Sequence, residues 1–86
     1  MCTHWCCEVL SPRSAADDRI VKLPLYSMSG ISWNWLVDPA VRTVECFETV
    51  GGKPTLAVTG RDSDSPVLPP FDLAFPLEHW WLRQAR

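Results

Sequence analysis

Residues 5–10 read WCCEVL, and this short stretch largely determines how the fold is interpreted. Five of its six side chains are apolar, and the single acid, Glu8, stands between them. An apolar run of this length, ended by Ser11-Pro12, predicts a central β-strand that is buried on both faces. A carboxylate inside such a strand is costly unless it is paired or binds a metal ion. Glu8 is therefore the first candidate site residue.

The stretch after this strand has the features of a helix. Ser14 can cap a helix that begins near Ala15, and the acids at positions 17 and 18 suit the positive end of the helix dipole. Apolar residues then recur at helical spacing until Met28-Ser29-Gly30, which predicts the end of the helix. Pro24 has no amide proton and its ring crowds the preceding turn, so we expect the helix to be kinked or divided there.

The rest of the chain predicts further strands and a short terminal helix. Residues 31–37 read ISWNWLV, a strand that is closed by an Asp38-Pro39 turn. Alternating polar and apolar residues predict a hairpin that turns at Gly51-Gly52 and pairs residues 43–50 with residues 54–60. We expect a short edge strand at Val67-Leu68 and an amphipathic helix from Pro76 to Leu82. The expected fold class is α/β: a mixed sheet, a helix flanking the first strand, and the hairpin.

The composition excludes several classes of protein. Apolar residues make up 47% of the 86 residues, with five tryptophans among them, so the chain is not of the disordered class. No apolar run reaches the roughly 18–20 residues that a membrane span needs. No signal peptide follows Met1, so we expect a cytoplasmic protein without a membrane partner. The net charge of −2 gives no sign of the basic surface of a histone-like DNA binder.

The cysteines leave one alternative site open. Cys2, His4 and Cys6 alternate near the start of the chain and could begin a zinc site, with Cys46 or His79 as a distant fourth ligand. The spacing lacks the CxxC pairs that are typical of zinc modules, and small apolar side chains on a strand are the simpler interpretation. We expect no disulfide framework, because two of the four cysteines are adjacent.

Several motifs in a fixed order carry a family resemblance. They are the stretch Glu8 to Pro12, then Asp18-Arg19, Lys22-Leu23, Tyr26 and Gly30, then Trp35 to Pro39, Arg42 to Glu45 and Pro66 to Phe71. In this order and spacing the sequence resembles the Uma-two family of restriction endonucleases, within the PD-(D/E)XK nuclease superfamily. The resemblance extends from Thr3 to about Leu82, and it implies a partial PD-(D/E)XK-like mixed sheet.

The resemblance also implies a function and a site. It implies an Mg²⁺-dependent endonuclease that acts on DNA, with Glu8 and Lys22 as catalytic residues and Glu8 as a ligand of Mg²⁺. Family members are usually about double this length, so we expect residues 1–86 to be a single truncated domain, the C-terminal half. The other half normally supplies a further acid of the metal site, and His4 stands where the family has an Asp. Because Mg²⁺ prefers anionic oxygen, we expect the isolated chain to be weakly active or inactive.

The chemistry of the residues can also be argued without the family. Hydrolysis of a phosphodiester needs an activated water and neutralisation of the phosphate charge, which carboxylate-bound Mg²⁺ and a lysine can supply. Lys22 lies on the helix after the strand, so we expect its amine to reach the pocket of Glu8. The rival interpretation is a non-catalytic remnant or protein-interaction fragment that self-associates through exposed apolar surface.

Overall fold

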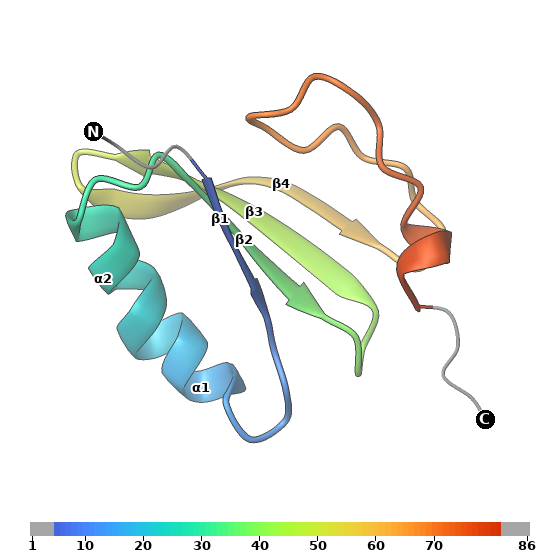
Figure 1. The fold of residues 1–86 in the computed structure, drawn as a ribbon, viewed down its shortest axis with the longest axis horizontal. Coiled ribbons are helices and arrows are strands. Elements are labelled where there is room, and N and C mark those ends of the chain that lie inside the picture. Colours follow the sequence, from blue (N-terminus) through green and yellow to red (C-terminus); the bar gives the residue numbers. More distant parts are fainter. Residues whose placement is uncertain (1–4, 82–86) are drawn as a thin grey trace.

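The computed structural model describes residues 5–81. In chain order the elements are β1 (Trp5–Val9), α1 (Ala15–Asp17), the π-helical turn η1 (Asp18–Lys22), α2 (Leu23–Met28), β2 (Trp33–Asp38), β3 (Thr43–Val50), β4 (Lys53–Arg61) and the 3₁₀ helix η2 (Leu77–Trp81). The helical pieces α1, η1 and α2 follow one another without a break and form one rod (Figure 1). None of the described helices is long and apolar enough to cross a membrane.

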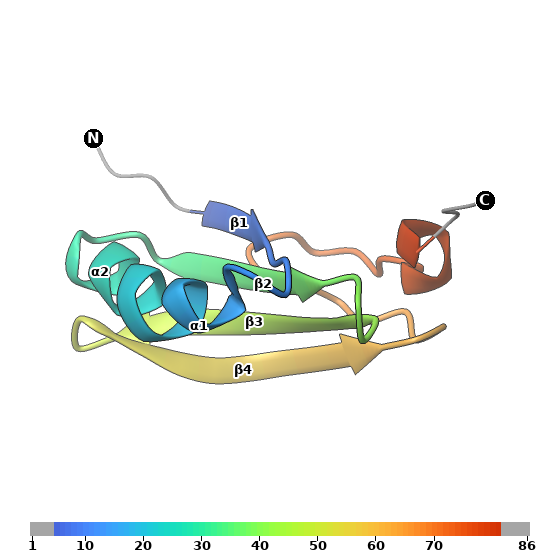
Figure 2. The same cartoon turned by 90° about the horizontal axis from the view of Figure 1, so that it is seen from below.

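The four strands form one mixed sheet in the order β1-β2-β3-β4. β1 and β2 are parallel neighbours joined by the helix, whereas β2 and β3, and β3 and β4, are antiparallel neighbours. The helix lies on one side of the sheet, and the segment that follows β4 returns along the other side (Figures 1 and 2). The expected α/β class, with a mixed sheet, a flanking helix, a hairpin and a short terminal helix, is confirmed.

β1 lies at the edge of the described sheet, so the expectation of a central strand is wrong. Its side chains alternate between half-buried and exposed, and Val9 is 64% exposed. On the face away from the helix, Trp5 forms T-shaped pairs with Trp35 and Phe71, with ring centroids 5.1 Å and 5.2 Å apart, and it remains 37% exposed. An apolar run is compatible with an edge strand as well as with a central one. The sequence gives the polarity of the two faces of the strand, and it does not show which segments cover those faces.

Two apolar clusters, one on each face, hold the layers together. On the helix side Leu23 packs with Leu10 and Leu36, and these three leucines are buried against Ala15 and Phe47. The larger cluster lies on the opposite face and contains Trp35, Val37, Val44, Cys46, Leu68, Leu77 and Trp81. Full burial of one such side chain stabilises a fold by about 1.5–3 kcal/mol, so both faces hold the sheet in place.

The helix begins with a reciprocal pair of serines rather than with a cap at Ser14 alone. The backbone N–H of Ser14 donates to Oγ of Ser11 at 3.2 Å, and the backbone N–H of Ser11 donates to Oγ of Ser14 at 3.3 Å. Ser14 already lies in the helical region, with φ −106° and ψ −6°, and it caps no N–H of α1. Ser11, followed by Pro12, therefore has the capping role expected of Ser14.

Pro24 divides the helix, as expected. The π-helical turn η1 ends at Lys22, two residues before Pro24, and the N–H of Leu23 donates to the carbonyl of Asp18, five residues earlier. Pro24 has no N–H for the carbonyl of Ile20, and in a regular helix its ring would clash with that carbonyl. A wider turn relieves this clash, which accounts for the π-helical segment at this position.

The hairpin is confirmed at the expected turn. β3 and β4 pair along their whole length around Gly51 and Gly52, whose φ angles are +59° and +78°. Positive φ at both central positions is the two-residue hairpin turn that glycine favours. A bulge between Cys46 and Phe47 shifts the register once along the pair.

The segment after β4 differs from expectation in one respect. Val67 pairs with Ala74 in a single antiparallel bridge, so the expected edge strand at Val67-Leu68 is wrong. Prolines 66, 69 and 70 lack N–H groups, which prevents a continuous ladder there. The short terminal helix is confirmed as the 3₁₀ helix η2, in which Leu77 is fully buried and Trp81 is 8% exposed.

Candidate functional site

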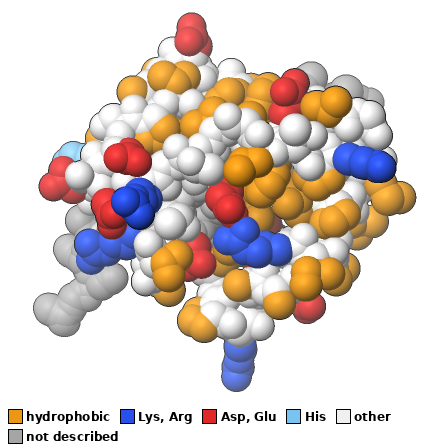
Figure 3. All heavy atoms as spheres, turned by 180° about the vertical axis from the view of Figure 1, so that it is seen from behind, with side chains coloured by type: hydrophobic (Ala, Val, Ile, Leu, Met, Phe, Trp, Pro, Cys, Tyr) orange, Lys and Arg blue, Asp and Glu red, His pale blue; other side chains and the backbone are white. Residues whose placement is uncertain are grey.

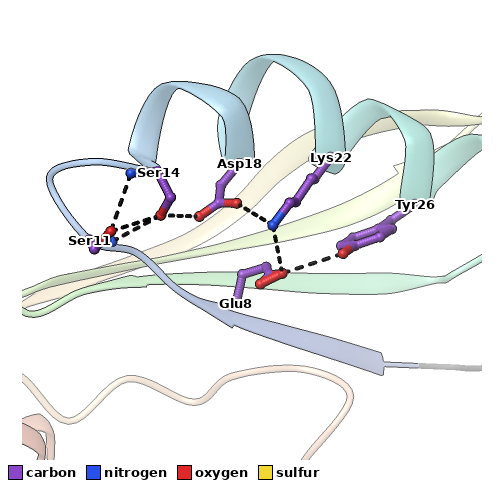
Figure 4. Close-up of polar contacts among 6 residues, drawn as sticks. All are labelled: Glu8, Ser11, Ser14, Asp18, Lys22 and Tyr26. Carbon is purple, nitrogen blue, oxygen red and sulfur yellow. Dashed lines mark hydrogen bonds and ion pairs between the residues drawn. The ribbon is translucent and has the colours of Figure 1, made fainter.

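Glu8 lies on β1 with its side chain directed toward the helix (Figure 4). It stands opposite Leu36 of β2, and the register continues from Leu36 to Glu45 of β3. Two carboxylates therefore flank Leu36 on the helix side of the sheet. The Glu8 side chain is 25% exposed, so it is half-buried at the boundary of sheet and helix and not fully buried as expected.

Lys22 extends from the helix, and its ammonium group lies between two carboxylates. Nζ of Lys22 is 3.1 Å from Oδ1 of Asp18 and 3.9 Å from Oε2 of Glu8 (Figure 4). The hydrogen bond and charge of Asp18, and then the charge of Glu8, raise the pKa of Lys22. The amine therefore stays protonated and can donate hydrogen bonds or neutralise negative charge.

Tyr26 contacts the same oxygen of Glu8 as Lys22 does. Its hydroxyl donates to Oε2 of Glu8 at 3.3 Å. Desolvation, and then the charge of Glu8, raise the pKa of Tyr26, so the phenol keeps its proton and remains a donor. Within residues 5–81 no side chain makes a hydrogen bond or ion pair to Oε1 of Glu8. Oε1 is thus the oxygen that can accept an external ligand.

Asp18 is the buried member of this cluster, with 2% of its side chain exposed. Its Oδ2 accepts a hydrogen bond from Oγ of Ser14 at 3.1 Å. The Ser14 hydroxyl is itself 3.0 Å from the hydroxyl of Ser11, in the turn that follows β1. A chain of polar contacts therefore runs from that turn through Asp18 and Lys22 to Glu8.

Glu45, the second carboxylate beside Leu36, also has an ion-pair partner. Glu45 forms an ion pair and hydrogen bond with Nη1 of Arg19, and both side chains are partly exposed. Arg19 comes from the same π-helical turn as Lys22. Each carboxylate on this face of the sheet is therefore paired with one cation from η1.

A scan against protein-family models finds a match to Uma2, described as "Putative restriction endonuclease", over residues 2–78. The chain belongs to the Uma2 family. The matched residues include β1, the whole helix and the hairpin, and with them Glu8, Asp18, Lys22 and Tyr26. A search of curated proteins finds no match.

The two residues expected to carry the Uma2 site do lie together in the structure. Sequence reasoning placed Glu8 and Lys22 in one pocket, and their charged groups are 3.9 Å apart. It missed Asp18 and Tyr26 as members of the cluster, although both belong to the quoted motifs. The signal that could have found them is spacing, because residues four before and four after Lys22 share its side of the helix.

Metal binding by this Uma2 chain would rest on Glu8. A carboxylate oxygen is the kind of ligand that Mg²⁺ prefers. Within residues 5–81, however, no group of three or more His, Cys, Asp or Glu side chains is placed to hold a metal ion. Of the other ligands considered for magnesium or zinc, His4 and Cys2 lie outside the described residues, whereas Cys6, Cys46 and His79 are described and form no such group. The Glu8 carboxylate is a suitable type of ligand for magnesium, but the ligands within residues 5–81 do not form a complete metal site.

Proposed function

We propose that this chain carries the Glu8–Lys22 part of an Mg²⁺-dependent site for DNA cleavage of the PD-(D/E)XK type. The observation that supports this most strongly is the position of a lysine ammonium over a strand carboxylate in a member of the Uma2 family. The alternative is that the Glu8 carboxylate has a structural role only. The half-buried Glu8 is contacted by Tyr26 at 3.3 Å and by Lys22 at 3.9 Å, and these long contacts favour the functional interpretation.

The residues of this chain have separable roles in the proposed reaction. Glu8 would hold the cation through Oε1, and the bound Mg²⁺ would supply charge neutralisation at the phosphate and a more acidic water. Lys22, kept protonated, would stabilise the negative charge that develops on the phosphate oxygens. Because one carboxylate holds Mg²⁺ weakly, we propose that the isolated chain has weak or no activity.

Membership of the Uma2 family supports DNA as the substrate. The hollow of about 310 Å³ that is lined by Thr43, Glu45, Thr59 and Arg61 includes neither Glu8 nor Lys22. The Glu8 cluster lies at β1, the edge strand of the described sheet. We propose DNA as the partner, and a cytoplasmic location agrees with the free thiols of the described cysteines.

The proposal is tested by plasmid nicking with purified protein in Mg²⁺ and in Mn²⁺, beside a Mn²⁺ titration followed by electron paramagnetic resonance. We expect weak Mn²⁺ binding that is lost in Glu8→Ala, and nicking that is weak or absent in the wild type and absent in Glu8→Ala and in Lys22→Met. Glu48→Ala is the matched control, because Glu48 is an exposed glutamate of β3. Mn²⁺ binding that is the same in Glu8→Ala and in the wild type, or nicking that persists in Glu8→Ala, would refute the assigned site.

A second candidate function, a protein-interaction fragment, is favoured by the outer face of the helix. Ile20, Val21, Leu25 and Met28 are all more than half exposed. Figure 3 shows hydrophobic side chains gathered over part of one face of the molecule. We propose that this face supports self-association, because contiguous exposed apolar surface is typical of interaction sites. Sedimentation equilibrium tests it: Leu25→Ser combined with Met28→Ser should shift the chain toward monomer, and an unchanged mass would contradict the proposal.

A further inference from the structure

Four polar side chains of the helix lie along the boundary with β1 at intervals of four residues. They are Ser14, Asp18, Lys22 and Tyr26 (Figure 4). In a regular α-helix four residues advance by about 400°, so a stripe at this spacing would rotate away by about 40° at each step. The wider turn η1 spans Asp18 to Lys22 and offsets this rotation. The contacts therefore continue in one line to Glu8.

Asp18 is the buried residue in this line of contacts. It is a carboxylate with 2% exposure, and both of its oxygens face polar partners. One oxygen accepts a hydrogen bond from Ser14 at 3.1 Å, and the other lies 3.1 Å from the ammonium of Lys22. The buried Oδ1 has no hydrogen-bond partner among the described residues besides this ion-pair contact, so movement of Lys22 away from Asp18 would leave Oδ1 uncompensated.

Lys22, in contrast, has a flexible stem that can reach either carboxylate. Its ammonium lies nearer to Asp18, at 3.1 Å, than to Glu8, at 3.9 Å. The longer distance is too great for a direct hydrogen bond. Lys22 therefore makes its close ion pair with Asp18, and its contact with Glu8 is the looser one.

We propose that Asp18 is a positioning residue that holds the Lys22 ammonium away from direct contact with Glu8. This inference rests on the proposed function, since its consequence is that the Glu8 carboxylate stays free of a close ion pair and is open to a cation. Without the negative charge of Asp18, Lys22 closes on Glu8 as a tight ion pair. The Lys22 ammonium then competes with a bound cation for the Glu8 carboxylate.

The test measures the contact between Lys22 and Glu8 without DNA or metal. A carbodiimide joins a carboxylate and an amine that touch, and peptide mass spectrometry reports the Lys22–Glu8 link. We compare the initial rates of Lys22–Glu8 link formation, before cross-links to other carboxylates consume the Lys22 amine. In Asp18→Asn we expect this rate to rise roughly two- to fivefold, the range that one partly exposed ion pair spans. Asp17→Asn is the matched control, an exposed acid one residue away with the same change of charge, and its rate should equal the wild-type rate.

The outcomes separate this proposal from the proposed function. A rate in Asp18→Asn that is unchanged or lower, with the circular dichroism spectrum of the folded chain, overturns the role of Asp18. If that variant unfolds, Ser14→Ala provides the test, because it removes the hydroxyl that contacts Asp18, together with the two bonds of that hydroxyl to Ser11. We expect a smaller rise there, and no rise overturns the role. A wild-type chain that does not bind Mn²⁺ refutes the proposed metal site and leaves the cross-linking result intact.

Discussion

Substitution of Leu36 by alanine tests how the helix that carries Lys22 is held on the sheet. Leu36 lies between Glu8 and Glu45 on the helix side, is 3% exposed, and packs with only two other buried leucines. A Leu→Ala change at such a site costs about 2.7–5 kcal/mol, from lost apolar contact and from the cavity that remains. A chain of 86 residues has about 4–13 kcal/mol of stability in total, so the variant is expected to lose about a fifth of it or more.

The assay is urea unfolding followed by far-ultraviolet circular dichroism, with the slope m compared between variants. Leu25→Ala is the matched control: it is the same chemical change on α2, at a side chain that is 52% exposed. Its free energy of unfolding should stay within about 0.5 kcal/mol of the wild type. If Leu36→Ala loses no more than Leu25→Ala, the small cluster does not hold the helix, and the reasoning about its packing fails.

Three further predictions concern single features of the fold. Glu8→Gln should leave the urea midpoint near that of the wild type, because its ion pair is partly exposed; a loss as large as that of Leu36→Ala would assign Glu8 to the core. Gly52→Ala should lower the thermal midpoint, since a side chain at φ +78° costs about 1–2 kcal/mol, whereas Gly51→Asn should be tolerated; equal midpoints would argue against the turn geometry. Burial raises the pKa of Cys46 to about 11, so folding favours the protonated thiol, and the unfolding free energy should fall from about pH 9 to pH 11. Cys46→Ala should show a smaller fall over that range, and identical profiles would contradict the assignment.

Features that depend on neighbouring residues could be predicted from the sequence. The glycine pair alone determines the hairpin turn, because it accepts positive φ at both positions. Pro24 alone predicts a disturbed helix, because it removes a hydrogen-bond donor wherever it stands. Neither effect requires knowledge of what packs against the segment.

The position of β1 could not be predicted, because it depends on which segments cover it. The apolar side chains of Trp5, Cys7 and Val9 are the same whether a neighbouring layer buries them or leaves them open. The role of Ser11 was missed for a related reason. Two serines three residues apart can each act as the cap, and only the observed pair of hydrogen bonds distinguishes them.

The sequence predicted those residues of the candidate site that the family resemblance supplied. Glu8 and Lys22 came from the family motif, and their proximity is confirmed. Asp18 looked like an ordinary acid at the start of a helix, where its charge suits the helix dipole. Its burial arises from the line of contacts between the helix and β1, and sequence position alone does not show which helical residue meets the sheet.

The residues of the Glu8 cluster lie close together in the sequence, so substitutions in distant parts of the fold should affect the cluster little. All of its members lie between Glu8 and Tyr26, on one strand and the helix that follows it. The large aromatic cluster on the opposite face is built from β2, β3 and the segment after β4. Substitutions in that cluster, such as at Leu77, should therefore lower the stability of the fold and leave the Lys22–Glu8 contact rate unchanged in the chains that remain folded. Substitutions at Leu36 or Leu23 loosen the helix itself and should change both quantities. The geometry proposed for cleavage thus depends on a small part of the chain, and the remainder of the described structure acts by holding that part against the sheet.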